Sequence, residues 1–245
     1  MMITSKAWND YTSRLAKINK KAAELMQKWI DANGYDDFDN MVEYAYALTS
    51  KYGSAAATLA CEMYEATAEA QGIFVAAAVP AETATINEVK HLIGEAAAKS
   101  PVLISPTVGK MVKQAGADTT LQNAGRDGAE WAWIPHGGET CAYCIILASR
   151  GWQKASADMV SHHAEHIHPN CQCEFAIRWN KKSGVSGYDP ETYKRKYYNA
   201  GAAGPDRINI LRRALREENK DQINAQKRAA YAERRERENG EKEET

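Results

Sequence analysis

Apolar residues recur over the first 70 positions at the spacing of amphipathic helices. In the first segment the apolar positions are alternately three and four residues apart, which is typical of a helix with one buried seam. They are Trp8, Tyr11, Leu15, Ile18, Ala22, Leu25 and Trp29. The segment ends at Asn33-Gly34, because glycine readily adopts the left-handed conformation of a helix C-cap.

A second amphipathic run begins after Asp37 or Asp39. Its apolar side comprises Met41, Ala45, Leu48, Tyr52, Ala55, Leu59, Met63 and Ala66. Since only residues 34–37 separate the two runs, they predict an antiparallel helical hairpin whose seams pack together. Prolines punctuate the chain from Pro80 to Pro106, with a shorter helix predicted over Ile86–Lys99.

The pattern changes after a further helix predicted from Thr107 towards Arg126. Residues 130–135 and 173–179 alternate between apolar and polar positions and are rich in aromatic side chains, which indicates two strands able to pair with each other. Residues 181–187 are linker-like, and a short tyrosine-rich helix is expected after Asp189.

A long charged helix is predicted from Asp206. Its apolar stripe consists of Ile208, Leu211 and Leu215, and beyond about Ala230 it offers no face to bury. The expected fold is therefore mainly α with a small β element (α+β). We expect a helical region over 1–125, a cysteine- and histidine-rich module over 126–180, and a charged helical tail over 181–245 that frays after about 235.

Composition narrows the class of protein. With 44% hydrophobic and 26% charged residues among 245, the chain has the composition of a folded protein. No N-terminal apolar region of a secretory signal and no apolar run of about 20 residues is visible, so we expect neither export nor a membrane span. The net charge of −1 divides into −5 over residues 1–180 and +4 over 181–245, which hints at an anionic partner for the tail.

The chemically informative residues gather in one short window. Four of the five cysteines lie between Cys141 and Cys173, and five of the six histidines lie between His136 and His168. Cys141 and Cys144 form a C-x2-C pair, and the turn-forming Pro169-Asn170 separates His168 from Cys171. Two such turns, each offering two ligands, are typical of a closed structural zinc site. Buried thiols without a metal are the alternative.

We rank Cys141, Cys144, His168 and Cys171 first as the zinc ligands, and a set of four cysteines that includes Cys173 second. This ranking assumes that extended backbone after Cys171 turns the thiol of Cys173 away from the ion. A closed site argues for a structural metal with no catalytic residue. Two alternatives stay open: a metal-dependent nuclease using His162, His163 or His166 as base, and a generic zinc-stapled interaction module.

The window resembles a known family. Cys141-Ala-Tyr-Cys144, followed by Leu-Ala-Ser-Arg150-Gly151 and then His168-Pro-Asn-Cys171-Gln-Cys173, is similar to the C-terminal module of Mu F-like minor head and head-morphogenesis proteins of tailed phages. The resemblance spans about residues 126–179. It implies a non-enzymatic minor capsid component in the virion, or in the cytoplasm of the infected bacterium during assembly, with the portal or major capsid protein as partner.

The same resemblance would bring the tail close to packaged DNA. Residues 181–235 carry 14 Lys and Arg against 7 Asp and Glu, with tyrosines interleaved, a composition suited to phosphate contact and base stacking. Because acidic residues are interspersed, a solvated helix stabilised by pairs four residues apart is the simpler interpretation. Oligomeric state and copy number are not indicated by the sequence.

Overall fold

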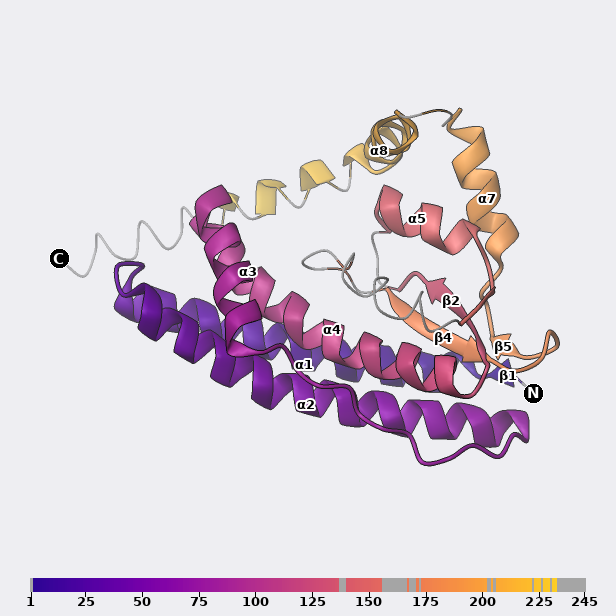
Figure 1. The fold of residues 1–245 in the computed structure, drawn as a ribbon. Coiled ribbons are helices and arrows are strands. Elements are labelled where there is room, and N and C mark those ends of the chain that lie inside the picture. The colour runs from indigo at the N-terminus through magenta and orange to yellow at the C-terminus, as the bar shows by residue number, and fades with distance from the viewer. Residues whose placement is uncertain are drawn as a thin grey trace.

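The fold is that of a computed structural model, which describes residues 2–136, 140–155, 167, 171, 173–201, 204, 206–221, 223–225, 227–229 and 231–232. It is mainly helical with a few short strands, as predicted. Figure 1 shows long helices forming a bundle along one side, and the short strands with helices α5 (Ala142–Ser149), α7 (Pro190–Asn199) and α8 (Arg207–Glu218) forming a smaller lobe over one end. Within the described part of the chain, no helix combines the length and apolar content needed to cross a membrane.

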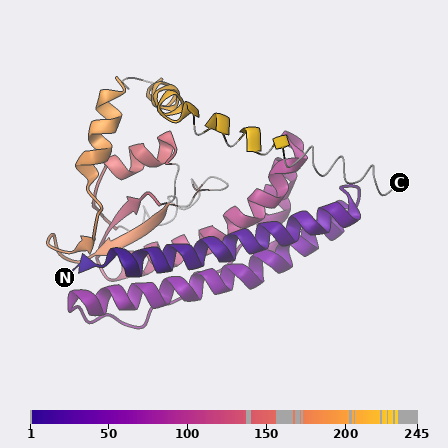
Figure 2. The ribbon, with the colours of Figure 1, turned by 180° about the vertical axis from the view of Figure 1, so that it is seen from behind.

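The predicted helical hairpin is confirmed. Helix α1 (Ser5–Asn33) and helix α2 (Phe38–Gln71) run side by side, as both ribbon views show (Figures 1 and 2). The side chain of Asp37 accepts a hydrogen bond from the backbone N–H of Asn40 and so caps the start of α2. Gly34, with φ of 75°, ends α1 and donates its N–H to the carbonyl of Ile30.

The buried seams depart from the strict heptad spacing in the second half of each helix. In α1 the fully buried positions change to Met26 and Ile30, whereas Leu25 and Trp29 are only partly buried. In α2 the expected Ala55 and Ala66 are exposed. An α-helix has 3.6 residues per turn, so a 3.5-residue seam drifts around it, and the buried face advances by one residue after a few turns.

Two more helices, one short and one long, complete the bundle. Helix α3 (Ile86–Lys99) has the predicted bounds and starts with a capping box made by Thr85 and Glu88. After a 3-10 turn, η1 (Pro101–Leu103), helix α4 (Ile104–Arg126) begins three residues before the expected Thr107. Helix α4 packs against both α1 and α2, so it is buried on most sides and lacks a one-sided apolar pattern.

The two predicted strands form and pair. Strand β2 (Glu130–Ile134) is antiparallel to β4 (Glu174–Arg178), and the two-residue β3 (Gln153–Lys154) pairs with the other edge of β2. Gln71, at the end of α2, accepts a hydrogen bond from the N–H of Trp179 and donates to the carbonyl of Ile177. This buried amide therefore joins the sheet to the helical hairpin.

The linker-like interpretation of residues 181–187 is wrong. Strand β5 (Gly184–Val185) pairs in parallel with β1 (Met2–Ile3), and Val185 is 4% exposed within the core of the bundle. The residues that flank Gly184 and Val185 are polar, so the sequence pattern gives no sign of this strand, which forms by pairing with the N-terminal segment. The segment thus holds the lobe to the start of α1.

Two further helices extend the lobe. Helix α7 (Pro190–Asn199) contacts helix α5 (Ala142–Ser149), and helix α8 (Arg207–Glu218) lies across α5 with Leu211 buried against Ala142 and Ile145. The predicted charged helix starts as expected and packs through its apolar stripe, but it is shorter than predicted, because α8 ends at Glu218.

Candidate metal centre

The first two cysteines of the centre are placed by the start of α5. Cys141 is the N-cap, and its sulfur accepts a hydrogen bond from the N–H of Cys144, with a sulfur–nitrogen distance of 3.4 Å. Cys144 lies in the first turn of the helix and is 1% exposed. A C-x2-C pair at a helix start directs both sulfurs to one side, where the positive end of the helix dipole favours thiolates.

The second pair lies just before β4 and reaches the first. The sulfurs of Cys144 and Cys171 are 3.5 Å apart, and those of Cys144, Cys171 and Cys173 all lie within 4.8 Å of one another. The Cys141 side chain hydrogen-bonds that of Cys144. The structure thus assembles four cysteines that are separated by up to 32 positions in the sequence.

The expectation that Cys173 points away from the others is wrong. In extended backbone, residues two positions apart lie on the same face, not on opposite faces. The sulfurs of Cys171 and Cys173 accordingly lie within 4.8 Å of each other. His168, which we ranked first, lies outside the described residues, as do His162, His163 and His166.

Burial and mutual contact raise the pKa of two of these thiols, Cys144 and Cys173. Hydrogen bonds with Cys141 and Cys171, together with burial, raise the pKa of the Cys144 thiol far above its ordinary value. The bond with Cys144 lowers the pKa of Cys173, but the bond with Cys171 and burial outweigh it and raise the pKa to about 12. A bound cation would instead favour the deprotonated thiolates, because coordination replaces the proton on each sulfur.

The donor set fits a tetrahedral zinc ion. Zn–S bonds of about 2.3 Å in a tetrahedron put neighbouring sulfurs about 3.8 Å apart. The 3.5 Å between the sulfurs of Cys144 and Cys171 is close to that value, and the 4.8 Å limit for the set of three needs only a small contraction. Thiolates are soft ligands that select zinc over magnesium or calcium.

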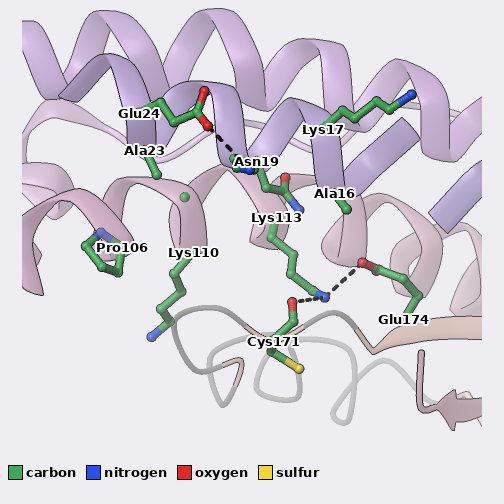
Figure 3. A pocket seen from close by; sticks show the side chains of 12 residues that line it. Ala16, Lys17, Asn19, Ala23, Glu24, Pro106, Lys110, Lys113, Cys171 and Glu174 are labelled. Atoms are coloured by element: carbon green, nitrogen blue, oxygen red, sulfur yellow. Dashed lines mark hydrogen bonds and ion pairs between the residues drawn. The ribbon is translucent and has the colours of Figure 1, made fainter. Parts of the chain in front are cut away.

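A buried lysine connects this centre to the bundle. The ammonium group of Lys113, on α4, donates hydrogen bonds to the carbonyl oxygens of Cys171 at 2.8 Å and Cys173 at 2.5 Å. It also pairs with the Glu174 carboxylate at 2.8 Å, and the two side chains are only 4% and 5% exposed. Figure 3 shows the contacts of Lys113 with Cys171 and Glu174, which line a groove of about 370 Å³ together with residues of α1 and α4.

The electrostatics of the pair favour a charged lysine. Burial acts to lower the pKa of Lys113, but the Glu174 carboxylate and the neighbouring Cys171 outweigh it, and the net shift is upward. The pKa of Glu174 is raised overall, because its burial outweighs the charge and the hydrogen bond of Lys113. A zinc ion bound by four thiolates carries a net charge of −2. The ammonium group of Lys113, bonded to the carbonyls of two of these cysteines, would therefore interact favourably with it.

Gly151 explains the end of the motif that follows Cys144. It has φ of 67° and donates its N–H to the carbonyl of Ala148, which terminates α5 after two turns. A Cβ at this position would also lie 3.4 Å from Pro190 at the start of α7. Glycine is therefore favoured by the backbone conformation, whereas Pro190 leaves room for a Cβ at ordinary contact distance.

Sequence reasoning did not identify Lys113 or Glu174 as parts of the centre. Lys113 stands in a helix with no marked apolar face, and its partners are 58 to 61 positions further along the chain. Glu174 is the first residue of a strand, and the alternating pattern does not show whether its side chain is buried or exposed. The two residues meet only because β4 packs against α4 in the tertiary structure.

Comparison with known protein families places most of the chain in one of them. The model of a family described as VG15 protein matches residues 2–200, which include the bundle, the four cysteines and α7. Neither the curated proteins nor the solved structures contain a match to this chain.

Proposed function

The chain belongs to the VG15 protein family, a family of phage proteins, and on that premise we propose that it is a minor capsid protein that acts in head morphogenesis. The observation that carries the proposal is the family match over residues 2–200. The finer assignment to the head is supported by the resemblance of the cysteine motifs to those of Mu F-like minor head proteins. Its place would be the virion, and its partner the portal or the major capsid protein.

We propose that a single zinc ion binds Cys141, Cys144, Cys171 and Cys173 and holds the lobe together. The sulfurs of Cys144, Cys171 and Cys173 lie within 4.8 Å of one another. Cys141, the fourth cysteine, joins them through a hydrogen bond between its side chain and that of Cys144. Four protein ligands leave no coordination position for water or substrate, which supports a structural metal and a non-enzymatic protein. In this assignment His168 is not needed as a ligand.

An exposed loop whose backbone is hydrogen-bonded to bundle side chains supports a role in protein–protein contact. Residues 73–85, between α2 and α3, carry no helix or strand, yet side chains of the bundle fix their backbone. Asn123 bonds both the N–H and the carbonyl of Val79, at 2.9 and 2.8 Å, and Arg126 donates to the carbonyls of Ala76 and Ala77. Phe74 projects from this loop and is 99% exposed.

An aromatic side chain presented on a pre-ordered backbone is typical of an anchor for a partner protein. Binding then loses little conformational entropy and removes a large apolar surface from water. Glu65 and Glu69 line the hollow beside Phe74, so the complementary pocket should be apolar with a basic rim. We assign this surface, the Phe74 loop, to the portal or capsid protein.

Co-expression with the portal protein and the major capsid protein of the same phage tests the proposal. The chain should co-purify with one of them, and Phe74→Ser should abolish the complex while leaving the fold intact. Val102→Ser, which changes another exposed apolar residue, is the matched control and should retain it. Absence of the chain from purified virions and assembly intermediates would contradict a head protein. DNA cleavage abolished by His163→Ala would contradict a non-enzymatic one.

A further inference from the structure

Helix α8 carries an exposed row of arginines on the side away from the lobe. Its apolar side is occupied, since Leu211 is 1% exposed and packs on α5 together with Ile208 and Leu215. Arg212, Arg213 and Arg216 are all exposed: Arg213 lies nearly opposite Leu211, and Arg216 and Arg212 lie between it and the edge of the apolar stripe. In Figure 1, α8 lies at the outer edge of the lobe, above α5.

These three arginines lack ion-pair partners among the described residues. The neighbouring basic residues of α7 differ in this respect: Lys194 pairs with Glu191 at 2.5 Å, and Lys196 lies 3.8 Å from Glu218 on α8. The acidic residues of α8 are thus directed elsewhere, with Glu217 bound to Lys220. The positive charge of α7 is balanced locally, whereas that of α8 is not.

The arrangement destabilises the isolated helix. Arg212 and Arg216 are four residues apart, and Arg213 and Arg216 three apart, so both pairs place like charges on adjacent turns. The only polar contact of these side chains among the described residues is a hydrogen bond from Arg212 to the side chain of Asn209. A ligand with several regularly spaced negative charges would convert this repulsion into binding energy.

We propose that this face, Arg212, Arg213 and Arg216, binds the phosphate backbone of double-stranded nucleic acid without sequence specificity. Guanidinium groups bind phosphate oxygens in pairs, and residues one turn apart are separated by about 6 Å along a helix, a spacing close to that of phosphates along one strand. An anionic membrane is the less suitable partner. Interfacial helices insert an apolar face, and that of α8 is already buried against α5.

The inference is independent of the proposed contact with a capsid protein, because α8 lies on the lobe and the Phe74 loop lies on the bundle. It concerns the purified full-length chain alone. Failure to bind nucleic acid would leave a capsid role untouched, and failure to bind a portal or capsid protein would leave the arginine face untouched.

Fluorescence anisotropy with a labelled 30-base-pair duplex provides the test, carried out over a series of salt concentrations. The triple variant Arg212→Gln/Arg213→Gln/Arg216→Gln keeps good helix formers on α8 and should bind at least tenfold more weakly at low salt. The slope of log K against log salt should fall in magnitude by about two to three, since each lost phosphate contact removes about 0.9.

A control of equal charge separates a specific face from net charge. The variant Lys21→Gln/Lys28→Gln/Lys51→Gln changes three exposed lysines of the hairpin and should leave both affinity and slope close to the wild type. The proposal is overturned by any of three results: no duplex binding by the wild type at low salt, equal weakening by the two triple variants, or binding to phosphatidylglycerol vesicles but not to the duplex. Circular dichroism should confirm that both variants remain folded.

Discussion

The ammonium group of Lys113 lies 2.8 Å from the carbonyl oxygen of Cys171, so a buried charge on a bundle helix holds the segment that carries two of the four clustered cysteines. The lobe is therefore attached to the bundle at the metal centre itself. Gln71 makes a second polar connection at the far end of β4. Between them, Tyr64, Leu121 and Trp131 belong to one apolar core that both parts of the chain share.

Loss of any one clustered cysteine should remove the metal. Cys144→Ser and Cys173→Ser should reduce zinc from one ion per chain towards none, measured by elemental analysis after exhaustive dialysis. Because metal binding contributes on the order of 10 kcal/mol to the folding of small zinc modules, both variants should also lower the unfolding temperature. Cys61→Ser, outside the cluster, should retain the metal and most of the stability. Retention of a full zinc ion by Cys173→Ser would instead favour His168 as the fourth ligand.

Truncating one partner of the buried ion pair should cost more than removing both. Lys113→Met leaves the Glu174 carboxylate buried and unpaired, and should reduce the free energy of unfolding by about 3–5 kcal/mol. The double variant Lys113→Met/Glu174→Met contains no buried charge and should recover part of that loss. Urea unfolding of the metal-loaded proteins measures both. A double variant no more stable than Lys113→Met would show that the unpaired Glu174 carboxylate is not the source of the loss.

Gly53 leaves space for the loop that presents Phe74. A Cβ at position 53 would lie 2.8 Å from Cγ2 of Thr83, so Gly53→Ala must displace either the loop or α2 and should destabilise the protein by about 1–3 kcal/mol. Removing the obstructing methyl group with Thr83→Ser should restore much of the stability. Gly94→Ala, where the nearest atom is 3.8 Å away, should stabilise helix α3 by up to about 1 kcal/mol. Thermal unfolding distinguishes the three variants, and equal effects of the two glycine substitutions would contradict the steric explanation.

Acid should weaken the end of α4. A hydrogen bond from Arg126, and a further one from Tyr64, hold the pKa of Asp127 below its ordinary value of 3.8 despite some burial. A carboxyl group whose pKa is lowered in the folded state stabilises the fold above its unfolded pKa, and this contribution disappears as the pH falls through the folded value.

Asp127→Asn should therefore cost about 1 kcal/mol at pH 7, and the difference from wild type should shrink as the pH falls towards 3. Urea unfolding at a series of pH values measures this difference, in which the acid sensitivity of the sulfur centre largely cancels. A gap that is constant with pH would mean that the amide loses packing and not a charged hydrogen bond.

Local signals were sufficient for much of the fold. Ile86–Lys99 could be placed to the residue because Thr85 and Glu88 form a capping box and Pro101 follows the helix. The strands around the cysteines could be paired because their alternation is strong and only two candidates exist. The drift from Leu25 to Met26 in α1 arises from the difference between 3.5 and 3.6 residues per turn, which a seam assigned by fixed spacing ignores.

The candidate site could be predicted only in part. Residue type and spacing pointed to Cys141, Cys144 and Cys171 because sulfur at two tight turns is a rare combination. The prediction that the Cys173 thiol points away from the ion is wrong, because residues two positions apart in extended chain share a face. No sequence pattern indicates that Lys113 reaches the same segment. Such a contact depends on which face of α4 the sheet covers, a property of the tertiary fold that has no local signature.

The pairing of Met2 with Gly184 has a consequence for synthesis of the protein. The two residues are 182 positions apart, so on the ribosome the N-terminal segment emerges early and waits for its partner until nearly the whole lobe has been translated. The hairpin can form from local contacts in that interval, but Ile3 of β1, which is buried in the finished fold, stays uncovered. Closure of this small parallel ladder should therefore be among the last steps of folding, and an extension fused ahead of Met2 would interfere with that step before any other.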